Sequence, residues 1–136
     1  MKRTYDVIVA GGGPAGLTCA LVLGRCLRSV IVFDTGTNRN RFSSALHGFP
    51  TRDGEKPAVF LDLLRRELSS YGIRVAKKHI TGAQKTKTGF RVTTAEGEHF
   101  ESVLLLLSTG LTDRLPAIPG LEKYYGRNVF HCPYCD

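Results

Sequence analysis

Two cysteines near the end of the printed sequence have a spacing that suits redox chemistry. Cys132 and Cys135 flank a Pro-Tyr dipeptide and form a C-x-x-C pair. Thiols at this spacing can close a small disulfide ring, and a helix N-terminus beside them lowers the pKa of one thiol. Asp136 follows directly and could give or take a proton during thiol–disulfide exchange. We therefore predict that Cys132, Cys135 and Asp136 are catalytic.

Other interpretations of this pair remain open, namely a zinc site and incidental spacing. A zinc ribbon needs a second pair of ligands, but only His131 is adjacent and the sequence has no further C-x-x-C. We therefore predict no metal site. The remaining cysteines, Cys19 and Cys26, are seven residues apart in an apolar helical pattern. That spacing corresponds to about 10 Å along a helix, too far for a disulfide, and we expect small core residues.

A glycine-rich segment, GGGPAG at residues 11–16, has the G-x-G-x-x-G spacing of a dinucleotide-binding turn. Gly11 would make the tight turn, Gly13 would admit a pyrophosphate, and Gly16 would allow close packing of a helix on a strand. A helix that begins at Pro14 and Ala15 would offer free N–H groups to the phosphates. We take these five residues as candidate cofactor-binding residues.

An acidic residue stands at the distance that such a turn requires. Asp34 lies 23 residues after Gly11 and closes an apolar run. A carboxylate there can accept hydrogen bonds from a ribose hydroxyl. Strand, helix and acid together predict a dinucleotide, without deciding which one.

The elements that position these residues follow from the hydrophobic pattern. Tyr5–Ala10 and Ser29–Asp34 are expected to be buried strands, with a helix to about Arg25 between them. Such a βαβ unit has parallel strands. The sequence thus predicts an α/β fold, Rossmann-like at its start.

The later elements are shorter. A polar loop at residues 35–56 precedes a helix that starts at Pro57 and stops at Gly72. We expect its apolar face to hold Phe60, Leu61, Leu64, Leu68 and Tyr71. Short strands are expected at Ile73–Ala76, Ile80–Gln84, Phe90–Thr94 and His99–Ser102, as an antiparallel meander. A separate, fully buried strand is expected at Val103–Leu107.

Composition excludes several classes. The 136 residues suffice for one core. The net charge is +7 and the pI about 9.5, but the basic residues are scattered, so we expect a solvated surface that attracts anionic cofactors and no nucleic-acid partner. No apolar run approaches the ~20 residues that cross a bilayer. We expect a soluble, cytoplasmic protein without a membrane partner.

Five segments together resemble the thioredoxin reductase-like family of FAD/NAD(P)-dependent pyridine nucleotide-disulfide oxidoreductases. They are YDVIVAGGGPAGL, VIVFDTG, HGFP, LLLLSTGLTDRLPAIPG and HCPYCD, and the resemblance covers essentially the whole chain. It implies that the βαβ unit binds the ADP half of FAD. It also implies that the loop with Arg41 and His47 lies beside the isoalloxazine and that Thr109 and Gly110 close over the FAD. Arg41 lies in a segment that departs from the reductases' usual Gly-Gln.

The resemblance also implies a reaction. NADPH would reduce FAD, the flavin would reduce the Cys132–Cys135 disulfide, and the dithiol would reduce a thioredoxin-like protein or a small disulfide. Related dithiol oxidases run the last steps in reverse, so the direction remains open, as does NADPH against NADH. C-P-Y-C is also the glutaredoxin sequence, but glutaredoxins place it after the first strand of a thioredoxin fold. The full-length family implies a homodimer.

The resemblance divides the chain in two. Residues 1–115 would be a FAD-binding domain that lacks its C-terminal segment. Residues 116–136 would be a linker and the start of an NADPH domain that is otherwise absent, because the sequence has one G-x-G-x-x-G motif. Two alternatives remain, a truncated, non-catalytic FAD-binding fragment or remnant and a stand-alone NAD-binding domain. We expect no NADPH-dependent turnover from these 136 residues alone.

Overall fold

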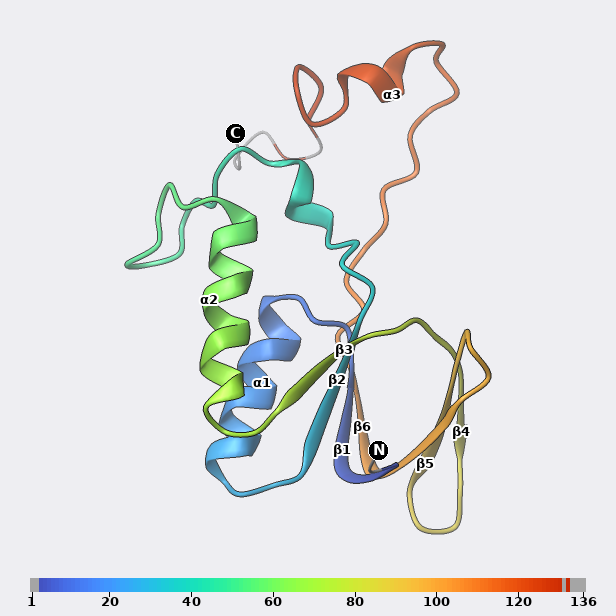
Figure 1. Ribbon diagram of the computed structural model, residues 1–136. Helices are drawn as coiled ribbons and strands as arrows, with labels where there is room; N and C mark the ends of the chain where they lie inside the picture. Colours follow the sequence, from blue (N-terminus) through green and yellow to red (C-terminus); the bar gives the residue numbers. More distant parts are fainter. Residues whose placement is uncertain (1–2, 131, 133–136) are drawn as a thin grey trace.

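The computed structural model describes residues 3–130 and 132, and a six-stranded mixed sheet forms its centre (Figure 1). The strands are β1 (Thr4–Ala10), β2 (Val30–Asp34), β3 (Arg74–Lys77), β4 (Ile80–Lys85), β5 (Phe90–Thr94) and β6 (His99–Leu107). The helices are α1 (Pro14–Arg25), the 3-10 helix η1 (Arg39–Phe42), α2 (Pro57–Ser69) and the short α3 (Leu121–Tyr124).

The sheet has the order β3-β2-β1-β6-β5-β4 and two halves of different kind. β3, β2, β1 and β6 from Glu101 onward are parallel, with Ala10 opposite both Phe33 and Leu107. β4, β5 and the first half of β6 are antiparallel. The expected α/β fold with a βαβ start is confirmed, and the carboxyl ends of β1, β2 and β6 meet at one edge.

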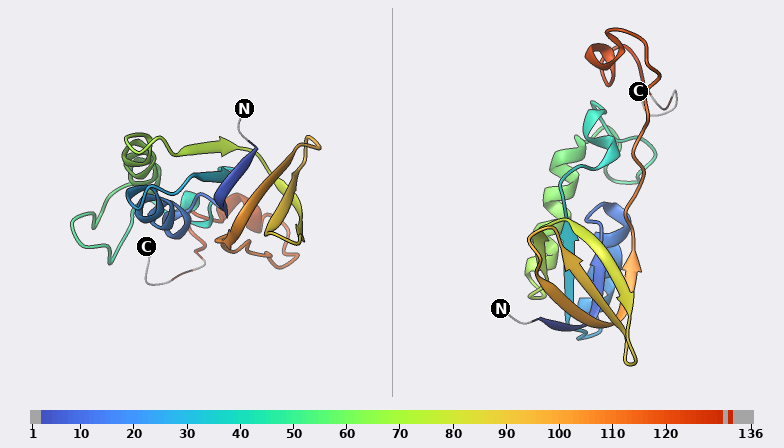
Figure 2. Two further views of the ribbon diagram at one scale, coloured as in Figure 1. Left: turned by 90° about the horizontal axis from the view of Figure 1, so that it is seen from below. Right: turned by 90° about the vertical axis from the view of Figure 1, so that its right-hand side faces the viewer.

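The two long helices pack on one face of the parallel half (Figures 1 and 2). Their apolar stripes meet alternate residues of β1 and β2, because successive strand side chains point to opposite faces. The buried cluster on this face is Val7, Val9, Leu17, Ala20, Val30, Val32, Leu61, Leu68 and Ile73.

The antiparallel strands cover the opposite face. Val92 of β5 and Phe100 of β6 pack against Ile8, Ile31 and Phe33. The rings of Phe33 and Phe100 meet edge to face with centroids 4.9 Å apart. This second cluster holds the antiparallel half against the βαβ unit and so fixes the end of β2, where Asp34 lies.

The expected meander is wrong at its first strand. β3 pairs in parallel with β2, at the opposite edge from β4. The reason is the intervening α2, because a strand that returns to the sheet after a helix enters parallel to the strand it left. The expected strands 99–102 and 103–107 also form one continuous strand, β6.

Val103–Leu107 is not fully buried, which corrects a second expectation. Val103, Leu104 and Leu107 are 58%, 59% and 70% exposed. β5 pairs with β6 only as far as Ser102, and the helices pack mainly on β1, β2 and β3. Two single-residue expectations also fail, since Cys26 is exposed beyond the end of α1 and Tyr71 is exposed beyond the end of α2. None of the helices in the described part of the chain is long and apolar enough to span a bilayer.

Candidate functional site

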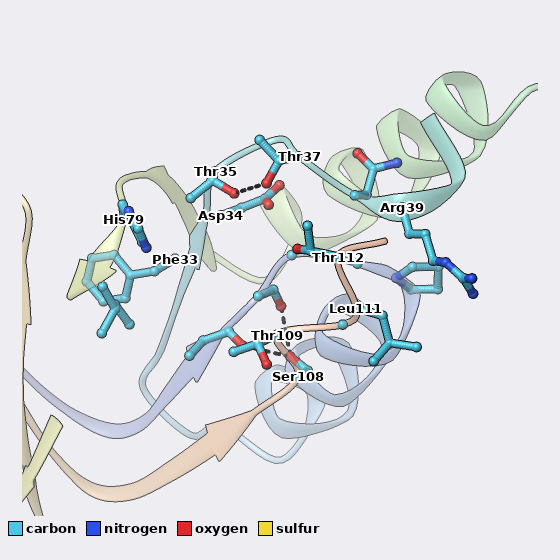
Figure 3. Close-up of a pocket in the computed structure, with 18 of the residues that line it drawn as sticks. Phe33, Asp34, Thr35, Thr37, Arg39, His79, Ser108, Thr109, Leu111 and Thr112 are labelled. Atoms are coloured by element: carbon cyan, nitrogen blue, oxygen red, sulfur yellow. Dashed lines mark hydrogen bonds between the residues drawn. The ribbon is translucent and has the colours of Figure 1, made fainter. Parts of the chain in front are cut away.

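A cavity of about 640 Å³ lies at the carboxyl ends of the parallel strands (Figure 3). Its wall comes from four segments that are distant in sequence. They lie within residues 10–14 at the end of β1, 33–40 from the end of β2, 78–80 from the end of β3 to the start of β4, and 108–112 after β6. Open α/β sheets bind ligands at this edge, where loops leave the strands in different directions.

Close contacts in the turn after β1 require glycine at two positions. A Cβ on Gly11 would lie 2.2 Å from the Ser108 carbonyl oxygen, and Gly11 has a φ of +111°. A Cβ on Gly16 would lie 2.1 Å from the Gly11 carbonyl oxygen. Gly13 differs, because it has no neighbour within 4 Å on its Cβ side and lines the cavity. The first two glycines therefore serve packing, whereas Gly13 leaves room for a ligand.

The N-terminus of α1 borders this open space. Gly13 is the N-cap residue and Pro14 the first residue of the helix. The first turn contains no acidic residue and receives no side-chain capping bond, so no side chain of the helix itself offsets the positive end of its dipole. Ala15 and Gly16 follow in the same turn, with backbone N–H groups suited to an anion.

Asp34 is held in a defined orientation at the end of β2. Its side chain is 14% exposed, and Oδ1 accepts a hydrogen bond of 3.0 Å from the Gly36 backbone N–H. Oδ2 lies 3.1 Å from Nη2 of Arg65, which reaches over from α2. A Cβ on Gly12 would clash with this carboxylate at 2.6 Å. The glycine turn and the acid are therefore in direct contact, as the sequence spacing requires.

Ser108 connects β6 to the glycine turn. Its hydroxyl donates to the carbonyl oxygens of Gly11 at 2.9 Å and Ala10 at 3.2 Å (Figure 3). Thr109 and Gly110 continue from it along the cavity wall. Thr109 and Gly110 are predicted site residues and Ser108 is not, although all three belong to the Ser-Thr-Gly that ends an apolar strand.

A second part of the cavity wall could not be predicted from any local sequence motif. Residues 78–80 line the cavity, and Figure 3 places His79 beside Phe33. Lys78 forms ion pairs with Glu98 and, at 3.4 Å, with Glu96. The hydrogen bond to Glu98 is the main reason that the pKa of Lys78 is raised. This wall depends on the parallel pairing of β3 with β2, which differs from the expected meander.

Two candidate residues lie away from this cavity. Arg41 donates hydrogen bonds to the carbonyl oxygens of Thr37 and Asn38 at 2.6 and 2.9 Å, and lines a neighbouring cavity of about 450 Å³. His47 is half-exposed, with Nδ1 3.6 Å from Asp53. The structure therefore gathers Gly11, Gly13, Pro14, Asp34, Thr109 and Gly110 at one cavity wall. Ala15 and Gly16 follow Pro14 in α1 without lining the cavity, and Arg41 and His47 do not line it either.

The cysteine pair is described only in part. Cys132 is half-buried and disulfide-bonded. Cys135 and Asp136 lie outside the described residues. Cys19 and Cys26 are free thiols. Within the described ranges, no cluster of His, Cys, Asp and Glu side chains could hold a metal ion.

The amino-acid sequence matches the model of a known protein family. The sequence profile of the pyridine nucleotide-disulphide oxidoreductases matches residues 5–136, and the chain belongs to this family.

Its curated relatives include thioredoxin reductases. The chain is 37% identical to the "Probable thioredoxin reductase" of Arthroderma benhamiae, over 99% of this chain and 35% of the relative. It is 34% identical to the thioredoxin reductase sirT of Leptosphaeria maculans, over 96% of this chain and 41% of the relative.

A solved structure is also similar to this chain. An oxidoreductase from Agrobacterium tumefaciens superposes with a TM-score of 0.90 at 41% identity, over 99% of this chain and 45% of that one. The chain therefore spans less than half the length of these relatives.

Proposed function

We propose that the cavity binds FAD and that the chain takes part in thioredoxin reductase-like electron transfer. The observation that carries this proposal is the convergence of three separate segments on one cavity. The glycine turn, the carboxylate of Asp34 and the Thr109-Gly110 wall all border the same 640 Å³ space.

The residues present suit an adenine dinucleotide. The pyrophosphate would lie at Gly13, where a side chain is absent and the first turn of α1 presents the N–H groups of Ala15 and Gly16. A ribose hydroxyl would donate to Asp34, whose carboxylate can accept more bonds than the two that Gly36 and Arg65 supply.

The remaining wall would hold the ends of the ligand. His79, which is exposed at the cavity wall, offers a ring face for an aromatic base, and the buried Phe33 lies beside it. Thr109 and Gly110 follow the end of β6 and line the same cavity. We keep Arg41 and His47 as candidates for contacts with the flavin end. Neither residue lines the cavity in the structure, so the 35–56 loop would have to change to bring them to it.

Bound FAD would supply a two-electron carrier between a nicotinamide and a disulfide. The chain's own contribution is the Cys132–Cys135 pair, which takes up two electrons and two protons when its disulfide becomes two thiols. Asp136 would exchange one of these protons. We propose NADPH as the electron source and a thioredoxin-like protein or small disulfide as the partner, in a cytoplasmic homodimer of the full-length protein.

The proposed domain division follows from the same assignment. Residues 1–115 contain all the segments that form the cavity wall, so we assign them to FAD binding. Residues 116–136 lead from this wall to the cysteines and are assigned to the linker and the start of the NADPH domain.

Thermal unfolding with added nucleotides tests this function. A ligand that binds only the folded state raises the midpoint, by an amount set by its concentration relative to its dissociation constant. We expect FAD to raise the midpoint of this protein more than equimolar NAD⁺ or NADPH. A larger rise with NAD⁺ would favour a stand-alone NAD-binding domain, and no rise with any of them would overturn the proposal.

A further inference from the structure

A cluster of charged and aromatic side chains connects the cavity wall to the segment that precedes Cys132. Asp113, just after the wall residue Thr112, is its centre. Nε of Arg39 lies 3.0 and 2.8 Å from the two carboxylate oxygens of Asp113, and Nη2 lies 2.7 Å from Oδ1. The hydroxyl of Tyr125 donates to Oδ2 of the same carboxylate at 2.5 Å. One carboxylate thus joins η1, the loop after β6 and the segment after α3.

Aromatic packing strengthens the same connection. The rings of Phe42 and Tyr125 meet edge to face, with centroids 5.1 Å apart. The guanidinium of Arg41 lies 4.2 Å above the Phe42 ring. Gly126 approaches so closely that a Cβ there would lie 2.7 Å from Cβ of Phe42. We call Arg39, Phe42, Asp113 and Tyr125 the clasp.

The other backbone contacts of this segment are local. Across the described part of residues 114–130, the backbone N–H groups bond to carbonyls of the same segment, such as Ile118 to Pro116 and Val129 to Tyr124. Leu111 and Ile118 are exposed. Local bonds maintain the shape of the segment but do not fix its place relative to the sheet. The clasp fixes the place of this segment relative to the sheet, because Arg39 and Phe42 belong to the loop that leaves β2.

We propose that the clasp fixes the segment of residues 116–130, and through it Cys132, relative to the cavity, with Arg39 and Tyr125 as positioning residues. Arg39 lines the cavity, and Tyr125 precedes Cys132 by seven residues. A bidentate guanidinium–carboxylate pair defines both distance and orientation, which a single hydrogen bond does not. The functional meaning of this position rests on the proposed FAD and dithiol chemistry, whereas the clasp itself can be tested without any ligand.

Hydrogen exchange of the purified chain tests the clasp. Tyr125→Phe removes one hydroxyl and keeps the ring, and Tyr124→Phe is the matched control because the Tyr124 side chain is 56% exposed. A hydrogen bond to a charged group is lost in the first variant only, so we expect exchange in peptides covering residues 119–130 to rise about tenfold. We expect Tyr124→Phe to stay within about twofold of the parent.

A pH series separates positioning from a general structural effect. In the parent, protection of residues 119–130 relative to β1 and β2 is expected to fall above pH 10, as the phenol that donates to Asp113 ionises. Arg39 and Arg41 favour that ionisation, whereas Asp113 opposes it. In Tyr125→Phe this pH step is expected to be absent.

The contradicting results are also distinct. Equal exchange in Tyr125→Phe and Tyr124→Phe would overturn the clasp. If Tyr125→Phe loosens β1 and β2 as well, Asp113→Asn decides, because it keeps the size of the side chain. A rise confined to residues 119–130 in Asp113→Asn supports the proposal, and parent-like exchange there overturns it. Failure of FAD to bind would contradict the proposed function but leave this result unchanged.

Discussion

Single residues at the cavity serve two different purposes, which their contacts distinguish. Gly11 and Gly16 lack side chains because backbone atoms of the turn and of Ser108 occupy that space. Gly13 lacks one although its space is open. A glycine kept beside a cavity without a steric reason in the protein is typical of a place where a ligand approaches the backbone. Ser108 then ties the turn to β6 through the carbonyls of Ala10 and Gly11.

The ionisation of Tyr125 gives a residue-scale prediction. Its hydrogen bond to Asp113 is the main cause of a raised pKa, because the bond favours the protonated phenol. A group whose pKa is raised by folding stabilises the protein below its unfolded pKa. That stabilisation is lost as the pH rises through the folded value, which here lies above 10.

Absorbance titration near 295 nm measures this ionisation. The difference between the parent and Tyr125→Phe isolates one phenol, and we expect its midpoint above 10. In Asp113→Asn the midpoint is expected to move down, because the carboxylate charge is gone. A midpoint at or below 10 in the parent would show that the hydrogen bond to Asp113 is not maintained in solution.

At the scale of elements, α1 carries the cofactor turn at one end and an unusual terminus at the other. Its C-terminus has the Schellman pattern, with the N–H of Arg28 bonded to Leu23 and the N–H of Leu27 to Gly24. Leu27 occupies the left-handed position with a φ of +58°, where glycine is preferred. Its side chain is 93% exposed and so contributes little packing to offset this strain.

Replacement of Leu27 is therefore expected to be favourable. Leu27→Gly relieves the backbone strain and is predicted to raise the free energy of unfolding in urea by about 1 kcal/mol. Leu27→Ala retains a Cβ and the strain, so it serves as the control and is expected to change little. Equal unfolding free energies for the glycine and alanine variants would contradict the strained terminus.

The elements show what sequence could and could not predict. The βαβ unit to Asp34 followed from local patterns, because apolar runs, glycines and Pro14 each define structure over a few residues. The placement of β3 did not follow from local patterns. Its four residues resemble any short strand, and only the crossover through α2 decides which edge of the sheet it joins. For the same reason His79 and Lys78 were missed, because they reach the cavity only from that edge.

On the scale of the whole molecule, the apolar surface is unevenly covered. β6 pairs with β1 along most of its length, but β5 accompanies it only through Ser102. The run at Val103–Leu107 looked buried because five consecutive apolar residues are typical of a central parallel strand. The described elements leave Val103, Leu104 and Leu107 more than half exposed. Burial depends on what packs against a strand and cannot be obtained from the strand alone.

This surface predicts binding of an apolar dye. A polar substitution at a site that is 70% exposed loses little packing, so Leu107→Ser is expected to leave the unfolding midpoint nearly unchanged. It is expected to lower the fluorescence of 8-anilinonaphthalene-1-sulfonate bound to the folded protein. The control is Val92→Ser in the buried core, which we expect to lower the midpoint strongly. Unchanged dye fluorescence together with a lower midpoint in Leu107→Ser would mean that this part of β6 is covered.

The central claim is that the cavity at the end of the parallel strands binds FAD through its pyrophosphate at Gly13. A side chain at Gly13 meets no protein atom, so Gly13→Asp is expected to fold normally and to place a negative charge where the phosphates bind. Gly82→Asp, also at an open and exposed glycine, controls for the added charge itself.

The decisive measurement is the dissociation constant of FAD from a flavin fluorescence anisotropy titration of the parent and these two variants. We predict saturable binding by the parent and by Gly82→Asp, and at least about tenfold weaker binding by Gly13→Asp, because like charges would meet at the helix N-terminus. No saturable binding by the parent, or equal dissociation constants for all three proteins, would contradict the claim.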